Sequence, residues 1–451
     1  MKTRVILLAA GKGVRMRSRL TKLLHPLGGR PMILHSLTAA EGVTEGVPLL
    51  VVGHGAEGIR LAVGARAEFV EQADQLGTGH AVLQARSACE GKADFVLVSN
   101  ADLPLLTSET LKKLAAAQKG NTGPFSMVTF KRREARGFGR VKRGASGEVL
   151  AIIEEAEASP EELAIDELNV GTYCFRADWL WPALEKLKPS PKKREYYLTD
   201  LLDLAAKAGQ QVVTVALEDP DEAIGVNTRE HLAEAEAALR KRVNRHWMSD
   251  GVTLIDPQTT YIESGATIGQ DTVLWPNTML LGTTHIGEDC IIGPNTTIKD
   301  SRVGDACKIQ AAVVEMAVID NHVDIGPFAH LRPGARLGEG VHMGNFGEVK
   351  SSTLGPGVKM GHFSYIGDAT IGANVNIGAG TITANFDGKN KNLTVIEEGV
   401  FIGSDTMLVA PLRIGKGART GAGAVVTKDV PPNTVVVGVP ARAIRKVEGS
   451  D

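Results

Sequence analysis

The sequence is poor in aromatic side chains, which make up only 4% of its 451 residues, whereas glycine occurs 51 times. This imbalance indicates that part of the chain is built from small repeated turns rather than around a bulky core. The length predicts two or three domains, and a hydrophobic fraction of 43% is enough to give each of them a buried interior.

Zinc-site and disulfide patterns are also missing. The four cysteines are scattered without CxxC spacing, at Cys89, Cys174, Cys290 and Cys307. This pattern fits a reducing, cytoplasmic location. The net charge of −2 offers no general attraction to nucleic acid or to an anionic membrane. The N-terminal apolar run, residues 5–10, is too short to span a bilayer. We therefore expect small-molecule substrates, no nucleic-acid partner and no membrane insertion.

In the first half, up to about residue 228, strand-like and helical stretches alternate. "RVILLAA", "PLLVVG" and "DFVLVSNAD" are strand candidates, and "GHAVLQARSACE", "TSETLKKLAAAQ" and "YYLTDLLDLAAKAG" have helical spacing. Such alternation predicts a mostly parallel sheet covered on both faces. Residues 229–249 are rich in Ala, Glu and Arg and contain neither Gly nor Pro, which predicts one helix that links the two halves.

From about residue 253 the pattern changes to aliphatic residues spaced six apart. Examples are Ile286, Ile292 and Ile298; Leu354, Met360 and Ile366; Ile371 and Ile377; and Ile396, Ile402, Leu408 and Ile414. Hexapeptide repeats of this kind build a parallel β-helix, with three short strands in each coil of about 18 residues. The inward aliphatic side chains fill a narrow prism, which explains why aromatics are rare. Ordinary hairpins are the alternative, and the persistent register disfavours them.

A glycine-rich loop, "LLAAGKGVRM" (residues 7–16), follows the first strand and is expected to open a helix. Gly11 and Gly13 would let backbone N–H groups approach phosphate oxygens, and a helix N-terminus would add a favourable dipole. Lys12, Arg15 and Lys22 add positive charge. The loop lacks the third glycine of a dinucleotide fingerprint and the GK[ST] of a P-loop. Taken alone, it is equally well explained as a tight turn.

Several motifs place this loop in a wider context. "LAAGKGVRM", "TKLLHPLGGRPM", "EQADQLGTGHA", "NADLPLL", "GFGRV", "ELNVG" and "AIGVNTRE" occur in the order seen in sugar nucleotidyltransferases. With the hexapeptide half, the chain resembles, over essentially its whole length, the bifunctional N-acetylglucosamine-1-phosphate uridyltransferase and glucosamine-1-phosphate acetyltransferase family. The resemblance implies an α/β fold class: a Rossmann-like nucleotidyltransferase domain (1–228), a linker helix (229–249) and a left-handed parallel β-helix of hexapeptide repeats (250–451). It also implies a homotrimer.

The resemblance assigns roles in the first half residue by residue. Arg15 and Lys22 would hold the triphosphate of UTP, and Asp102 and Asn227 would bind Mg²⁺, which prefers oxygen ligands. The UTP and UDP-sugar contacts would be Leu8, Ala9, Ala10, Gly11, Lys22, Gln72, Gly77, Thr78, Gly139, Glu154, Asn169 and Asn227. A sugar-1-phosphate oxygen would then attack the α-phosphorus in line, with catalysis by positioning and charge neutralisation.

The residues before Asp102 depart from the family pattern. Asn100 and Ala101 stand where the family usually has Gly before this Asp, often preceded by an aromatic, so we expect the Ala101 methyl group to lie where the nucleotide passes. "LTK" also replaces the commoner "LPK" before Lys22. The alternative role for Asp102 is that of a turn residue, because "NADLP" is good turn chemistry.

The hexapeptide half contains polar residues that a repeat does not need. Arg332, Lys350, His362, Tyr365, Asn376, Asn385 and Lys391 recur at roughly one-coil intervals. Residues one or two coils apart lie near each other, so Arg, Lys and Tyr gathered there would suit a phosphate. A β-helix that serves only in assembly is the alternative, and it leaves this set unexplained.

The same residues match the acetyltransferase site of the family. His362 would be the general base that takes a proton from the amine of glucosamine-1-phosphate, and Arg332, Lys350, Tyr365, Asn376, Asn385 and Lys391 would bind this sugar phosphate. The acetyl-CoA contacts would be Ala379, Asn385, Phe386, Ser404 and Ala422, with the Ala379 N–H facing the developing oxyanion. Phe386 stands where the family commonly has Tyr, and the tail "VVVGVPARA" differs from the Arg-bearing tail of some members, so that Arg442 and Arg445 would have to take over its CoA phosphate contacts.

Two other enzyme classes are alternatives to this interpretation. A hexapeptide zinc carbonic anhydrase needs a close histidine pair five residues apart, whereas His322, His330, His342 and His362 are spaced by 8, 12 and 20 residues; the spacing excludes it. A nucleotidyltransferase for another sugar or base, such as glucose-1-phosphate with dTTP, stays open, because uracil and thymine differ by one methyl group.

Overall fold

The computed structural model describes residues 2–133, 135, 137–155, 158–190 and 194–447. The chain divides into two compact units, Met1–Leu239 and Arg240–Asp451. The division falls within helix α9 (Arg229–Ser249), the longest helix among the described residues. Each unit has its own hydrophobic core.

The first unit is built on one twisted sheet with strand order β11-β7-β10-β6-β1-β4-β5. The bounds are β1 (Thr3–Ala9), β4 (Leu49–Val52), β5 (Glu68–Glu71), β6 (Phe95–Asn100), β7 (Phe125–Lys131), β10 (Glu167–Arg176) and β11 (Val213–Ala216), with β8 (Arg140–Arg143) and β9 (Val149–Ile153) paired beside β10. Strands β5, β4, β1 and β6 are parallel, as the sequence predicts. Strand β10 runs antiparallel to both of its neighbours, so the other half of the sheet is mixed.

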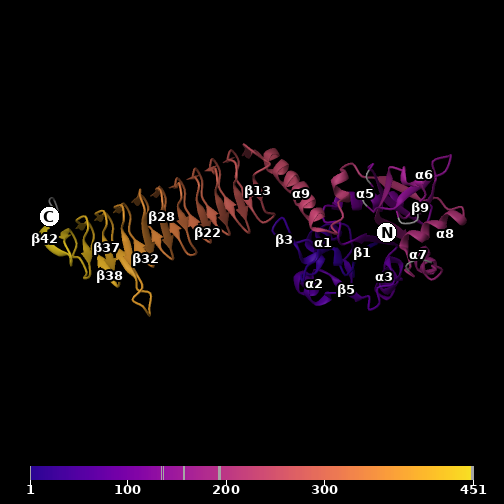
Figure 1. Cartoon of the computed structure of the whole chain (residues 1–451), viewed down its shortest axis with the longest axis horizontal. Helices are drawn as coiled ribbons and strands as arrows, with labels where there is room; N and C mark the ends of the chain where they lie inside the picture. Colours follow the sequence, from indigo (N-terminus) through magenta and orange to yellow (C-terminus); the bar gives the residue numbers. More distant parts are fainter. Residues whose placement is uncertain (1, 134, 136, 156–157, 191–193, 448–451) are drawn as a thin grey trace. The chain divides into compact units, whose positions relative to one another are not determined.

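Helices cover both faces of this sheet (Figure 1). Apolar residues of α1 (Ile33–Glu41), α2 (Ala56–Val63) and α5 (Ser108–Lys119) pack on one face. Those of α3 (Thr78–Gln84), α4 (Arg86–Cys89), α7 (Ala177–Leu184) and α8 (Leu201–Lys207) pack on the other. The carboxyl ends of β1, β4, β5 and β6 meet at one edge, which is where ligands bind in open α/β sheets.

The expected helix after the glycine-rich loop is wrong. The loop opens only a three-residue 3₁₀ turn, η1 (Val14–Met16). Gly13 before this turn and Arg17 after it both adopt left-handed backbone conformations, with φ of 63° and 48°. Two left-handed residues so close together end the turn at once, and no α-helix dipole is available at this loop.

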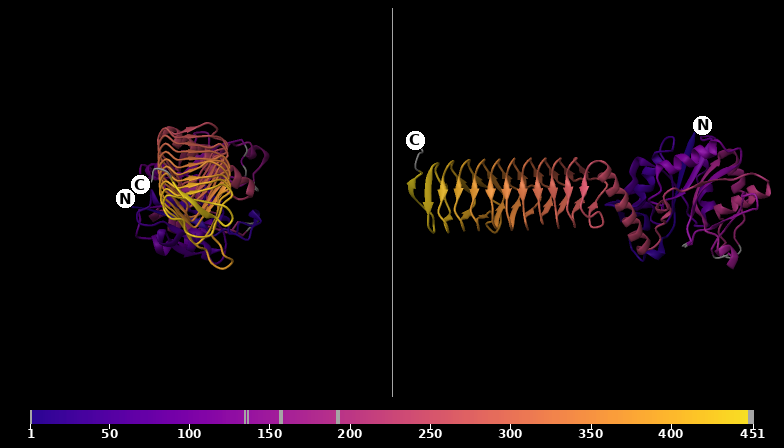
Figure 2. Two further views of the ribbon diagram at one scale, coloured as in Figure 1. Left: turned by 90° about the vertical axis from the view of Figure 1, so that its left-hand side faces the viewer. Right: turned by 90° about the horizontal axis from the view of Figure 1, so that it is seen from above.

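The second unit is a parallel β-helix (Figures 1 and 2). From β12 to β40 every third strand belongs to the same sheet, starting from β12 (Thr253–Leu254), β13 (Tyr261–Ile262) and β14 (Thr267–Ile268). Within one sheet, Ile291 pairs in parallel with Val273 of the coil before and Lys308 of the coil after. The stack ends in an antiparallel hairpin, β41 (Thr434–Val437) and β42 (Arg442–Lys446).

The hexapeptide register is confirmed by burial. All twelve aliphatic residues of the sequence pattern are buried, from Ile286 at 0% exposed to Ile377 at 3%. They form one continuous core along the stack, and this arrangement is the left-handed parallel β-helix class of hexapeptide proteins.

One coil is longer than the others. Lys359 pairs with Asn376, but Asn376 pairs onward with Phe401, and the extra residues form a loop between β34 (Ile382–Ala384) and β35 (Thr394–Ile396). The loop projects from the stack near β32 (Ala369–Ile371) and β38 (Leu412–Ile414) in Figure 1. Asp387 holds its tip by accepting the N–H groups of Lys389 and Asn390 at 2.8 and 2.7 Å.

Among the described residues no helix is both long enough and apolar enough to cross a membrane.

Candidate active sites

A cavity of about 260 Å³ opens at the carboxyl edge of the first unit's sheet. It brings together the proposed metal ligand Asp102 and eight of the predicted nucleotide contacts: Leu8, Ala9, Ala10, Gly11, Lys22, Gln72, Gly77 and Thr78. These residues come from the end of β1 and the segment after it, which includes the 3₁₀ turn η2 (Lys22–Leu24), from the loops after β5 and β6, and from the start of α3. Gln75, Glu195 and Tyr197 also line the cavity, and the sequence analysis did not select them.

Lys22 lies between the two residues proposed to bind the metal. Its Nζ donates to Asp102 Oδ2 at 2.6 Å and to Asn227 Oδ1 at 3.1 Å. The Lys22 side chain is only 10% exposed and that of Asp102 24%. A carboxylate and an amide oxygen therefore converge on one partly buried cation, and such hard oxygen donors fit Mg²⁺.

The expectation about Ala101 is wrong. Its side chain is fully buried in the core cluster that contains Leu103 and Leu111. Its carbonyl accepts a hydrogen bond from Ser36 Oγ at 2.9 Å. Because strand β6 ends at Asn100, which lines the cavity, the next side chain points into the core and its methyl group does not narrow the nucleotide site.

The three residues proposed for the sugar lie together but do not line this cavity. The Asn169 N–H donates to Gly139 O at 2.8 Å, and a Cβ on Gly139 would lie 3.7 Å from Glu154 Oε1. Asn169 Nδ2 also donates to the Tyr173 hydroxyl at 2.7 Å. Burial raises the pKa of Tyr173 well above its ordinary value, so the phenol stays neutral. Arg15, on η1, is exposed and lies outside the cavity lining.

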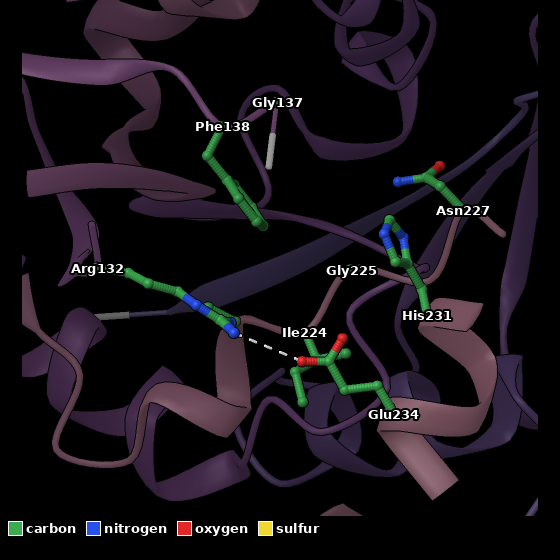
Figure 3. Close-up of a pocket in the computed structure, with 9 residues that line it drawn as sticks. Arg132, Gly137, Phe138, Ile224, Gly225, Asn227, His231 and Glu234 are labelled. Carbon is green, nitrogen blue, oxygen red and sulfur yellow. Dashed lines mark ion pairs between the residues drawn. The ribbon is translucent and has the colours of Figure 1, made fainter. Parts of the chain in front are cut away.

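A second, smaller cavity of about 90 Å³ adjoins Asn227 (Figure 3). Phe138, Ile224 and His231 contribute to its wall, and Arg132 pairs with Glu234 at 3.6 Å across it. Asn227 therefore faces this cavity and also contacts the Lys22 ammonium. Phe138 directly precedes Gly139 in the chain. This cavity therefore adjoins the residues proposed to bind the sugar, Gly139, Glu154 and Asn169.

In the second unit, one corner of the β-helix carries the residues proposed for acyl transfer. A Cβ on Gly378 would lie 2.5 Å from Ser404 N, and one on Gly403 would lie 2.8 Å from Ala422 N. The Gly380 N–H donates to Phe363 O at 2.7 Å. His362, Ala379, Ser404 and Ala422 thus occupy the same corner in four successive coils. His362 is exposed, and among the described residues the Ala379 N–H has no hydrogen-bond acceptor.

A cluster of cations lies on the sheet that follows this corner. Arg332 follows β25 (His330–Leu331), Lys350 ends β28 (Gly347–Lys350), and Tyr365 is in β31 (Ser364–Gly367). Lys391, on the projecting loop, contacts Lys350, and this contact lowers the pKa of Lys391. The loop therefore brings Lys391 into the cation cluster. Two ammonium groups close enough to affect each other in this way form a site for an anion such as phosphate.

Two acidic residues that the sequence analysis missed position this cluster. Glu348 accepts from Arg332 Nη1 at 2.8 Å, which raises the pKa of Arg332. Asp368 accepts from Asn385 Nδ2 at 2.5 Å. Their spacing of about one coil from the cations was available in the sequence, but the hexapeptide pattern alone does not distinguish them from surface residues.

Two further residues proposed for the acetyl site, Asn376 and Phe386, differ in their relation to the cations. Asn376 is in β33 (Asn376–Ile377), which belongs to the sheet before the corner, whereas Lys350 and Tyr365 belong to the sheet after it. Phe386, on the projecting loop, is 60% exposed. Within one chain Asn376 therefore does not join the phosphate cluster, whereas a β-bridge with Lys391 places Phe386 beside it.

Among the described residues, no three His, Cys, Asp or Glu side chains gather as a metal cluster. A metal at Asp102 and Asn227 would thus draw its remaining ligands from substrate and water, which is the usual arrangement for Mg²⁺.

Comparison with known proteins agrees with this architecture. The model of the MobA-like NTP transferase domain matches residues 5–253, and the bacterial transferase hexapeptide model matches residues 265–300 and 393–428. The chain is thus a two-domain transferase, with a nucleotidyltransferase domain followed by a hexapeptide-repeat domain.

Proteins named bifunctional protein GlmU match nearly its whole length. The relative from Heliobacterium modesticaldum is 46% identical over 97% of this chain and 95% of its own. Those from Exiguobacterium sibiricum and Shouchella clausii are 47% and 43% identical over 96% of this chain, and over 96% and 95% of their own lengths. The chain belongs to the GlmU family.

Proposed function

We propose that this chain makes UDP-N-acetylglucosamine in two steps. The second unit acetylates glucosamine-1-phosphate with acetyl-CoA, and the first unit transfers a uridylyl group from UTP to the N-acetylglucosamine-1-phosphate, with release of pyrophosphate. The observation that carries the proposal is the presence, in one chain of this family, of two separate polar sites. One is formed by the Asp102 carboxylate and the Asn227 amide, which both contact Lys22. The other is the cation cluster beside the corner that carries His362.

For uridylyl transfer, Lys22 and Arg15 would neutralise the triphosphate, and Gly11 would let phosphate oxygens approach the backbone. Asp102 and Asn227 would hold Mg²⁺, which when bound supplies charge stabilisation at the phosphates. The nucleotide cavity would then hold the base against Gln72, Gly77 and Thr78. The group of Gly139, Glu154 and Asn169 would bind the sugar, with Glu154 accepting its hydroxyl protons.

For acetyl transfer, Arg332, Lys350, Tyr365 and Lys391 would bind the phosphate of glucosamine-1-phosphate. His362, one coil before Ala379, would take a proton from the amine, which then attacks the thioester. The free Ala379 N–H would stabilise the oxyanion that develops on the thioester carbonyl. Ser404 and Ala422 would continue the acetyl-CoA wall along the same corner.

We further propose that the active form is a homotrimer with acetyl sites between neighbouring β-helices. Phe328 and Phe346 stack at 5.1 Å on the outside of adjacent coils, and each is about 60% exposed. Phe363, beside His362, is 56% exposed. An exposed aromatic column of this kind favours association. A neighbouring chain would also bring an Asn376 to the cations that this residue does not reach within one chain.

A cytoplasmic location is part of the proposal. All four cysteines are free and buried in this structure, which suits a reducing compartment.

The other function considered is a nucleotidyltransferase in which the β-helix serves only in assembly. An assembly module has no need for two ammonium groups held together, or for a histidine beside an unpaired backbone N–H. One assay tests the choice: the protein with glucosamine-1-phosphate and acetyl-CoA either releases free CoA thiol or does not. Thiol release dependent on the sugar phosphate supports the proposal, and no release contradicts it.

A further inference from the structure

The side-chain amide of Gln72 is held in one orientation by the protein. Gln72 follows β5 and lines the nucleotide cavity, yet it is only 3% exposed. Its Nε2 donates to Gly77 O at 3.1 Å. Because a backbone carbonyl can only accept a hydrogen bond, this contact establishes which end of the amide carries the nitrogen.

The second N–H of the same amide points to His80, which is on α3. Gln72 Nε2 lies 3.0 Å from His80 Nδ1. An amide NH₂ has two hydrogens, and Gly77 takes one, so Nδ1 must accept the other. This requires the neutral imidazole with its proton on Nε2. The Gln84 Nε2 lies 3.0 Å from that ring nitrogen and donates to His80 O at 3.2 Å. A half-turn of the Gln84 amide lets its oxygen accept the ring proton, and it gives up the hydrogen bond to His80 O.

Both hydrogens of the Gln72 amide are thus occupied, whereas its oxygen Oε1 has no hydrogen-bond partner among the described residues. We propose that His80 is a specificity-determining positioning residue, which fixes Gln72 so that only a carbonyl acceptor is presented to the nucleotide base. This inference rests on the proposed uridylyl transfer and on Gln72 as a base contact. It selects a base with an imide N–H, such as uracil.

The chemistry of the bases explains the selection. Uracil carries an N–H at position 3, and this N–H can donate to Gln72 Oε1. Cytosine carries a lone pair there, so two acceptors would face each other without a proton between them. A polar site left unpaired in this way commonly costs at least about 100-fold in kcat/KM. Thymine has the same imide N–H, so His80 does not separate dTTP from UTP.

Two amide substitutions at position 80 distinguish this role from simple packing. In His80→Asn, Oδ1 takes the place of Nδ1 and can still accept from Gln72. In His80→Gln, the amide lies near the place of Nε2 and leaves no acceptor at the place of Nδ1. Both variants replace the ring by a neutral amide, so a merely structural role predicts similar effects. His80→Ala removes the same acceptor without adding bulk, and replaces His80→Gln if circular dichroism shows that variant to be unfolded.

The experiment measures pyrophosphate release with N-acetylglucosamine-1-phosphate, from UTP and from CTP. For His80→Asn we expect a ratio of kcat/KM for UTP over CTP within about threefold of the unaltered enzyme, because one accepted hydrogen bond is preserved. For His80→Gln we expect the ratio to fall at least about tenfold, mainly through a higher KM for UTP, since the amide is free to turn. Equal ratios in the two variants, or an unchanged ratio in His80→Gln, would overturn the inference. Failure of the unaltered enzyme to use UTP would instead overturn the proposed function.

Discussion

The Lys22 ammonium lies 2.6 Å from the Asp102 carboxylate, although the two residues are 80 positions apart in the chain. The same ammonium contacts Asn227 Oδ1, so one cation joins the loops that follow β1, β6 and η5 (Pro220–Ala223). This contact locates the centre of the proposed uridylyl-transfer site.

Replacing Asp102 tests that centre. We expect Asp102→Asn to lower uridylyl transfer on the order of 1,000-fold, because the charge that would hold the metal is lost. Pyrophosphate release measures this step, and CoA thiol release should stay unchanged because the acetyl site is in the other unit. Normal uridylyl transfer by Asp102→Asn would refute the metal assignment.

Lys22 occupies the space between the two proposed metal ligands. We therefore expect Lys22→Met to bind Mn²⁺ more tightly without nucleotide, by roughly threefold to tenfold, because a competing cation is removed. Uridylyl transfer should fall at the same time, because the phosphates lose their lysine. Calorimetric titration measures the affinity. Lys112→Met is the matched control, since Lys112 pairs with Glu109 on the surface. Equal metal affinity in Lys22→Met and the control would contradict this account.

His362 is expected to serve acetyl transfer alone. His362→Ala should lower CoA thiol release by about 100-fold to 10,000-fold, the usual range for loss of a general base. Uridylyl transfer to N-acetylglucosamine-1-phosphate should stay normal. His285→Ala, which removes an exposed histidine that contacts Thr267, is the control. A His362→Ala variant with normal acetyl transfer would exclude this histidine as the base.

The two lysines of the phosphate cluster predict a pH dependence. Lys350 lowers the pKa of Lys391, so Lys391 loses its charge at a lower pH than an ordinary lysine does. As pH rises through that lowered pKa, the cation is lost and KM for glucosamine-1-phosphate should increase. In Lys350→Met the pKa of Lys391 should return toward that of an ordinary lysine, so the increase in KM should begin at higher pH. At lower pH the KM of this variant should already be about tenfold higher, because one positive charge is missing. A KM profile that keeps its pH dependence in the variant would argue against this coupling.

The aromatic column predicts the oligomeric state. Phe346→Ser removes one of two stacked, exposed rings, and we expect it to weaken a trimer by about tenfold or more, as loss of an interface aromatic often does. Sedimentation velocity at several concentrations measures this. Val313→Ser, another exposed apolar position, is the comparison variant. A monomeric unaltered protein would disprove the trimer.

The repeat pattern predicted the β-helix well because each coil is stabilised by its neighbours through the same few contacts. Ile286, Ile292 and Ile298 are buried for that reason. The glycine-rich loop was harder to predict, because Gly13 and Arg17 end the helical turn through backbone conformations that no periodicity records.

Site residues that act through another side chain were also missed. His80 lies within the motif "EQADQLGTGHA", but its contact with Gln72 depends on where α3 lies relative to the end of β5. Glu348 and Asp368 hold the phosphate-binding residues through contacts between coils. Asn376 was predicted to join the cations, yet a coil has three faces, and spacing by whole coils does not tell which face a residue occupies.

The most direct test of the whole account is one incubation of the protein with glucosamine-1-phosphate, acetyl-CoA, UTP and Mg²⁺, followed by mass spectrometry of the nucleotide sugar. The account predicts UDP-N-acetylglucosamine, formed only when acetyl-CoA is present. An unacetylated UDP-sugar, or no nucleotide sugar at all, would contradict it.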